Sequence, residues 1–164
     1  MAEDFANITM IKVISYQSKY KPDFKRLNLE WLDKYNLTES HDLEILDDPQ
    51  GTVIDRGGCI FLAIEGERVV GTAGLWKENE KEYELIKMTV DPVYRGQGIS
   101  KILLDRCLTE AGKLKAEKVF LFSNSQLQTA LKLYVKYGFC NVEVTDAPFL
   151  TADVKMELSL APNQ

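Results

Sequence analysis

The sequence predicts an α/β fold, because strand-like and helix-like patterns alternate along its 164 residues. Apolar or alternating runs between turn residues indicate strands, whereas apolar residues spaced three and four apart indicate amphipathic helices. The length suits one domain of about 100 to 200 residues. We therefore expect a single domain at residues 10–160, with residues 1–9 as an N-terminal extension.

The first half of the chain predicts an edge strand, a helix and a meander of three antiparallel strands. Pro22 suits the first turn of the helix. A polar segment rich in turn-forming residues separates that helix from the meander. The expected elements are a strand at 10–16, a helix at 23–35, a long connection at 38–58 and strands at 59–65, 68–77 and 83–90.

The second half predicts a crossover that returns to the same sheet. After strand 83–90 the apolar period becomes helical, and the run at 118–123 has the apolar character of a buried strand. Strands 83–90 and 118–123 should therefore be parallel, with a right-handed connection. The expected elements are helices at 98–113 and 127–136 and strands at 118–123, 141–145 and 153–158.

Composition excludes several classes of protein. The net charge of −5 argues against broad electrostatic binding to nucleic acid or to an anionic membrane. Cys59, Cys107 and Cys140 form no metal-binding spacing with the lone His41, so neither a disulfide framework nor a metal site is expected. The start of the chain is acidic and the apolar runs are short. We therefore expect no signal peptide, no membrane span and a cytoplasmic location.

Residues 90–101 carry the strongest chemical signal. A strand ends, a turn containing Gly96 and Gly98 follows, and a helix begins with its apolar face in phase. Free N–H groups at a helix N-terminus favour an anion, and glycines let a phosphate approach the backbone closely. Arg95 and Lys101 add a local charge of +2. The P-loop and dinucleotide-binding patterns do not fit, because Lys101 stands where the latter needs its third glycine.

Arg95-Gly96-Gln97-Gly98-Ile99-Ser100 resembles the pyrophosphate motif Q/R-x-x-G-x-G/A of the GCN5-related N-acetyltransferase (GNAT) family. A second block, with Ala130, Leu133, Tyr134, Gly138 and Phe139, resembles that family's later motif. The resemblance extends over most of residues 10–158. It implies a mixed sheet of six to seven strands flanked by helices, acetyl-CoA as cosubstrate, no metal, and direct acetyl transfer to a primary amine in a ternary complex.

The resemblance also assigns the acetyl-CoA site. Backbone N–H groups of Arg95, Gly96, Gln97, Gly98, Ile99 and Ser100, extended by Lys101, would bind the pyrophosphate. Met88 and Val90 would contact the pantetheine arm through their main chain, with the Val90 N–H polarising the thioester carbonyl. Two residues depart from the family pattern: Ser100 replaces a glycine or alanine, and Leu127 stands where many members carry an asparagine, with Asn124 nearby.

Tyr134 resembles the family tyrosine that protonates the departing thiolate. A phenol with a pKa of about 10 can protonate a thiolate whose acid has a pKa of about 8.5. Glu84 lies where several members keep a base for the amine. Alternatives remain open: Tyr134 can be a packing residue with Tyr137 as the acid, Glu84 can be a solvated side chain, and His41 can be the base.

The acceptor is expected to contact the first helix, through Trp31 and Tyr35, and the connection after it. The acidic residues Asp42, Glu44, Asp47, Asp48 and Asp55 either attract a cationic amine or form a solvated loop. A small molecule is favoured over a protein as acceptor. Two other functions remain open: a non-catalytic acyl-CoA sensor, and an acetyltransferase for protein N-termini or lysines. Monomer and homodimer are both compatible with the sequence.

Overall fold

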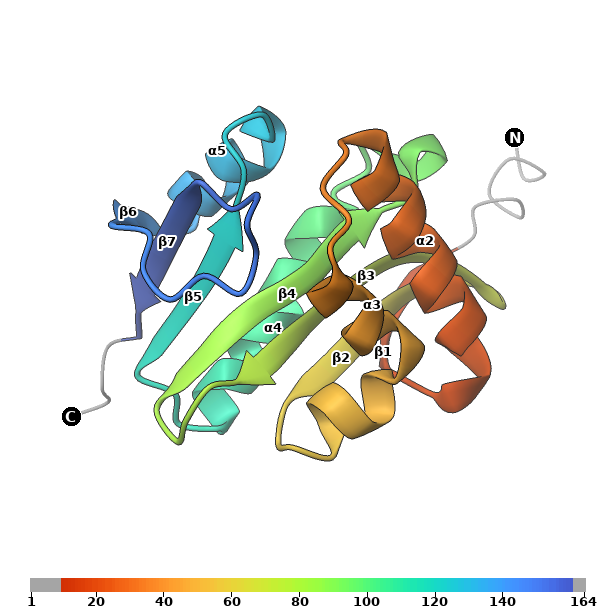
Figure 1. Ribbon diagram of the computed structural model, residues 1–164. Coiled ribbons are helices and arrows are strands. Elements are labelled where there is room, and N and C mark those ends of the chain that lie inside the picture. The colour runs from red at the N-terminus through yellow and green to blue at the C-terminus, as the bar shows by residue number, and fades with distance from the viewer. Residues whose placement is uncertain (1–9, 161–164) are drawn as a thin grey trace, which may run out of the picture.

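The computed structural model describes residues 10–160 (Figure 1). Within them, seven strands form one mixed sheet in the order β1-β2-β3-β4-β5-β7-β6. The strands are β1 Ile11–Ser15, β2 Cys59–Glu65, β3 Arg68–Lys77, β4 Glu82–Val90, β5 Lys118–Ser123, β6 Cys140–Val142 and β7 Val154–Ser159. The α-helices are α2 Lys21–Lys34, α3 Ser40–Asp47, α4 Ile99–Lys113 and α5 Gln128–Lys136, and short helical turns are η1 Ser18–Tyr20, η2 Gln50–Ile54 and η3 Pro92–Tyr94.

The predicted strands and helices occur in the expected order, with one further α-helix, α3, before the meander. Strand β1 is an edge strand, β2 to β4 form an antiparallel meander, and β4 pairs in parallel with β5 across helix α4. The apolar runs at 59–65, 68–77 and 118–123 have the bounds that their sequence indicated. The run at 141–145 is a strand only over Cys140–Val142, and residues 143–153 instead form a long loop before β7.

Helices cover both faces of the sheet. Helices α2 and α3 lie on the front face in Figure 1 and α4 lies behind it. Under α2 and α3 a core cluster includes Phe24, Ile45 and Ile86. On the opposite face a larger cluster joins Leu103 of α4 to Tyr134 of α5. The sheet therefore has a core on each face, and strands β2, β3 and β4 contribute buried residues to both cores.

The long connection expected at 38–58 contains two helical elements that the sequence did not predict, α3 and η2. Helix α3 begins with a cap in which the Asp42 carboxylate accepts from the Glu39 N–H at 2.9 Å, while the Asp42 N–H donates to the Glu39 carbonyl oxygen at 3.0 Å. The segment buries few apolar residues, chiefly Ile45, Leu46 and Val53. Its polar surface masked the short helical period.

Strands β4 and β5 diverge after a short stretch of pairing. They pair only at Glu82 with Lys118, Tyr83 with Val119 and Glu84 with Phe120. Residues of both strands beyond these pairs line a pocket between them. Glu84 thus marks the point at which the sheet opens, and the opening is visible between the β4 and β5 arrows in Figure 1.

A β-bulge changes the direction of β4 within this open stretch. Thr72 pairs with Thr89 and Gly74 with Ile86, so Ala73 of β3 faces both Lys87 and Met88. Lys87 has the left-handed φ of 51°. The Thr72 hydroxyl donates to the Lys87 carbonyl oxygen at 2.6 Å and accepts from Asn28 Nδ2 at 3.2 Å. The bulge is therefore held by buried contacts from β3 and α2.

Candidate active site

A cleft with a volume of about 600 Å³ runs along the end of β4, the turn before α4 and the start of α5. The predicted motif lines it: Arg95, Gly96, Gly98, Ile99, Ser100 and Lys101 all face this cleft, together with Met88 and Val90. Gln97 is exposed and does not line the cleft. The segment that the sequence analysis singled out is thus placed along one continuous surface.

The turn before α4 presents its backbone to this cleft. Gly96 and Gly98 have φ values of 79° and 77°, which only glycine adopts without strain. No atom lies within 4 Å of the position that a Cβ would occupy at either residue. Gly98 is the N-cap of α4, so the first N–H groups of a 15-residue helix point toward the cleft. Anion binding is what this geometry favours.

Within residues 10–160 one buried side-chain polar atom of β4 lacks a hydrogen-bond partner, and one backbone N–H of the same strand points toward this region. The Thr89 hydroxyl is buried without a hydrogen bond, and Thr89 lines the cleft. The Asp91 N–H donates to the Val70 carbonyl oxygen of β3 at 2.8 Å. Because successive N–H groups of a strand point to opposite edges, the Val90 N–H points toward the gap left by β5. These groups fit a ligand whose polar atoms follow β4, as a pantetheine arm would.

A second pocket, with a volume of about 120 Å³, adjoins the cleft on the side of α2 and α3. Glu84 and Tyr134 both line it, so the two predicted catalytic residues come together. Trp31, Met88, Leu127 and Ala130 line both spaces. Tyr35 lines only the larger cleft. The two cavities therefore meet at Trp31, one of the two residues expected to contact the acceptor.

Glu84 lines this pocket and is buried, with only 6% of its surface exposed. Burial raises its pKa to about 7, although the positive charges of Lys87 and Lys155 partly oppose the shift. Within the described residues, its carboxyl group forms no hydrogen bond or ion pair. Glu84 is therefore a free carboxyl group whose protonation changes near neutral pH, as a general base requires.

Tyr134 is buried, and its ring packs edge-on against Phe139 with 5.7 Å between centroids. Burial and the neighbouring Cys107 raise its pKa, so the phenol keeps its proton at neutral pH. The alternative acid, Tyr137, lines neither cavity. Its hydroxyl donates to Asp105 at 2.7 Å on the outer side of α4. Tyr134 is thus the tyrosine that faces the pocket.

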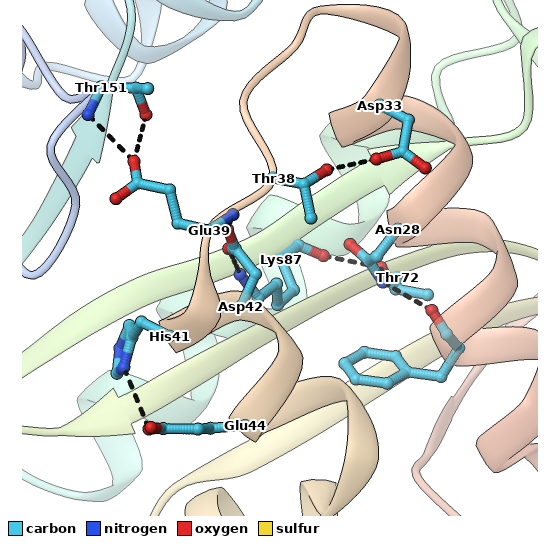
Figure 2. A network of polar contacts seen from close by, with 11 residues as sticks. Asn28, Asp33, Thr38, Glu39, His41, Asp42, Glu44, Thr72, Lys87 and Thr151 are labelled. Atoms are coloured by element: carbon cyan, nitrogen blue, oxygen red, sulfur yellow. Dashed lines mark hydrogen bonds and ion pairs between the residues drawn. The ribbon is translucent and has the colours of Figure 1, made fainter.

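An ion pair that the sequence analysis did not find lies beside Glu84. Lys87 Nζ pairs with Asp42 Oδ1, and both side chains are almost completely buried (Figure 2). Lys87 Nζ also lies 5.3 Å from the centroid of the Phe149 ring. Asp42, Lys87 and Phe149 all line the smaller pocket. The β4 bulge that directs Lys87 here has no glycine or proline as a sequence marker.

The loop before β7 forms a strap over the same pocket; we use strap for residues 149–153. Glu39 accepts from the N–H groups of Leu150 and Thr151 at 2.7 and 2.9 Å and from the Thr151 hydroxyl at 2.5 Å; Figure 2 shows the contact with Thr151. On the other side, Asn124 Nδ2 donates to the Thr151 carbonyl oxygen at 2.7 Å. The strap is thus tied both to the start of α3 and to the end of β5.

Other candidate residues lie away from the pocket. His41 packs between Trp76 and Phe149, with ring centroids 5.8 and 5.1 Å away, and lines neither cavity. Of the acidic residues considered for the acceptor, only Asp42 lines a cavity. The amide group of Asn124 is engaged by Thr151 and by the Gln126 N–H, and Asn124 lines the smaller pocket rather than the cleft. Asn124 therefore contacts the strap beside the smaller pocket.

Comparison with solved structures agrees with this architecture. An acetyltransferase of the GNAT family from Staphylococcus aureus has a TM-score of 0.85 and 25% identity, with 93% of this chain and all of that chain covered. The PaiA N-acetyltransferase of Thermoplasma acidophilum, solved in complex with coenzyme A, has a TM-score of 0.74 and 15% identity, with 92% and 99% covered. Within residues 10–160, no helix has the length and apolarity that crossing a membrane requires.

The sequence relatives match this chain over only part of their own length. An uncharacterised N-acetyltransferase of Mycobacterium bovis is 32% identical over 104 residues, which are 63% of this chain and 62% of that protein. The N-acetylaspartate synthetase of Rattus norvegicus is 35% identical over 106 residues, 64% of this chain and 34% of that protein. The acetyltransferase (GNAT) family matches residues 22–139. With its motif, its open sheet and this match over most of its length, the chain belongs to the GNAT family.

Proposed function

We propose that this protein transfers the acetyl group of acetyl-CoA to the primary amine of a small molecule. The proposal is carried by the meeting of two cavities at Trp31. One is a long cleft beside the turn that contains Gly96 and Gly98, which we call the glycine turn, and the other is a small pocket lined by Glu84 and Tyr134. The first suits a long ligand with phosphates and the second a compact acceptor. The TM-score of 0.74 to a relative solved with coenzyme A supports the first assignment.

Two residues of the chain carry out the proton transfers of this reaction, Glu84 as the base and Tyr134 as the acid. The acetyl-CoA supplies an activated acetyl carbonyl, to which the amine nitrogen bonds as the carbon–sulfur bond breaks. Glu84 takes the proton that the amine must lose before it can attack. The Val90 N–H donates a hydrogen bond to the carbonyl oxygen as negative charge develops there. Tyr134 gives its proton to the departing thiolate, and its raised pKa keeps that proton available until then.

A small acceptor fits the pocket better than a polypeptide. Its volume of about 120 Å³ is below that of a cavity of about 150 Å³ that holds one benzene molecule. The strap lines it through Phe149, Thr151 and Ala152 and is tied on both sides. A peptide would need a groove open where the strap lies. A protein N-terminus or lysine is therefore a less suitable acceptor for this pocket than a small amine.

The proposal is tested by following free CoA thiol with a panel of primary amines, together with thermal stabilisation by acetyl-CoA. We expect stabilisation and amine-dependent release of thiol. The Tyr134→Phe variant should lower turnover about 100-fold or more, the usual contribution of a positioned acid, while acetyl-CoA affinity stays unchanged. Stabilisation without transfer to any amine would instead indicate a non-catalytic acyl-CoA sensor, and an unchanged turnover number would remove Tyr134 from the mechanism.

A further inference from the structure

The β4 bulge places Lys87 on the same face of the sheet as Glu84. In a regular strand, residues separated by an odd number of positions point to opposite faces, so Lys87 would point toward α4. The extra residue of the bulge reverses this alternation. Lys87 instead reaches Asp42 of α3 and lines the acceptor pocket. A cationic group is thereby brought next to the carboxyl group proposed as the base.

The contact with Asp42 does not engage all the N–H donors of the Lys87 ammonium group. Asp42 Oδ2 accepts from the Glu39 N–H at 2.9 Å as part of the cap of α3, and Asp42 Oδ1 pairs with Lys87. A lysine ammonium has three N–H donors. Within the described residues, the ion pair with Asp42 is the only hydrogen bond of Lys87 Nζ, whose other near neighbour is the face of Phe149. Donors therefore remain for an oxygen atom inside the pocket.

Burial makes these remaining donors significant. The Lys87 side chain is 7% exposed and the Asp42 side chain 3% exposed, so bulk water has little access to either. A buried charge with unfilled hydrogen bonds is costly unless a partner occupies the site. Lys87 lines the pocket together with Glu84 and with Met88, which also lines the cleft. The pocket thus offers an anion site beside a base.

We propose that Lys87 is the specificity-determining residue of the acceptor pocket, and that the acceptor is a small amino acid-type molecule whose carboxylate binds Lys87 while its amine lies against Glu84. This proposal rests on the acetyl transfer proposed above and names its substrate class. In an α-amino acid the amine and the carboxylate share one carbon atom. A carboxylate on Lys87 therefore holds the amine close by, in the direction of Glu84 and the acetyl group.

The test compares each common α-amino acid with the amine left when its α-carboxylate is removed, such as alanine with ethylamine and histidine with histamine. We expect the protein to prefer the accepted amino acid by about 10-fold or more in kcat/KM, the scale of a charge-assisted contact. Lys87→Met should lower kcat/KM about 10- to 100-fold more for the amino acid than for its decarboxylated amine, mostly through KM, at a pH well above 7 where Glu84 is ionised in both proteins. Lys87→Arg should restore part of the preference.

Two further variants separate recognition from folding. Lys87→Met strands the buried charge of Asp42, so the double variant Lys87→Met/Asp42→Asn supplies a folded protein without a cation in the pocket. Lys77→Met is the matched control, because Lys77 also lies on the sheet in an ion pair, with Glu80 at 2.9 Å, but lines neither cavity. The control should keep the full preference for the carboxylate.

A binding measurement keeps this inference separate from the proposed activity. With CoA bound, at least one of the common α-amino acids should raise the melting temperature while its decarboxylated amine does not, and Lys87→Met should abolish the difference. This result would support the inference even if no acetyl transfer were detected. Preference for the decarboxylated amines, or an equal loss for both members of a pair in Lys87→Met, would overturn it and leave the acetyltransferase proposal intact.

Discussion

Glu84 combines two properties that burial imposes together. It lies where β4 and β5 separate, so it faces the acceptor pocket, and its exclusion from water raises its pKa to about 7. A folded state that holds a proton longer than the unfolded chain loses stability as the pH rises between the two pKa values. The unfolded value for a glutamate is about 4.3. The carboxylate form therefore costs stability and supplies the base.

Replacing Glu84 by glutamine should consequently affect stability and activity in opposite directions. Between pH 4.5 and pH 7 the wild-type protein should lose up to about 3 kcal/mol of unfolding free energy through this group, and Glu84→Gln should not. Denaturant unfolding at pH 5 and pH 8 measures the difference. The variant should lose about 100-fold or more in kcat, together with the rise in rate through about pH 7. An unchanged rise in the variant would assign the base to another group.

The strap is held on the α3 side by a single side chain, that of Glu39. Glu39 is the N-cap of α3 and also accepts three hydrogen bonds from Leu150 and Thr151. Burial alone would raise the pKa of Glu39, but the hydrogen bonds from Thr151 and Leu150 outweigh it and hold the pKa below its usual value. Their stabilisation is thus present above the ordinary glutamate pKa of about 4.3 and is lost as the pH falls through the lower folded value.

Glu39→Ser separates the two roles of this residue. Serine is a good N-cap, so α3 should persist, but its side chain is too short to reach the strap. We expect faster amide exchange at Leu150 and Thr151, a higher KM for the acceptor amine and an unchanged affinity for acetyl-CoA. Gln50→Ser, a polar residue of η2 that lines neither cavity, is the control. An unchanged acceptor KM despite faster exchange would show that the strap does not close the pocket.

The sequence predicts elements well where pattern alone determines them. Strands such as 59–65 and 118–123 are apolar runs between turn residues, and the glycine turn marks its own place before α4. The strap and the Lys87–Asp42 pair lacked such a signal, because both depend on contacts between segments far apart in the chain. Lys87 in particular follows from a bulge that Thr72 and Asn28 stabilise. Without the pairing of β3 and β4, alternation would assign Lys87 to the wrong face.

At the scale of the whole molecule, the sheet is two parts joined by a short seam. Strands β1 to β4 are joined to β5, β7 and β6 through only three residue pairs between β4 and β5. The cleft and the acceptor pocket both lie beyond this seam, where β4 and β5 are no longer paired. A ligand that fills the gap replaces the absent strand pairing. Binding of acetyl-CoA should therefore stabilise the fold as a whole as well as the glycine turn.

This expectation gives a prediction with a matched control. At an acetyl-CoA concentration 100 times the Kd, the unfolding free energy should rise by about 2.7 kcal/mol, or about 5 to 11 °C in Tm for a chain of this size. Amide exchange should slow at residues 85–90.

Gly98→Glu should abolish both effects by placing a carboxylate at the anion site. Gly66→Glu is the control, because Gly66 also has a positive φ, of 61°, with no atom within 4 Å of a Cβ, but lies in the turn between β2 and β3. Both variants carry the same backbone strain and the same added charge. Loss of stabilisation in Gly98→Glu alone would therefore locate the phosphates of acetyl-CoA at the start of α4, and full stabilisation of a folded Gly98→Glu variant would place them elsewhere.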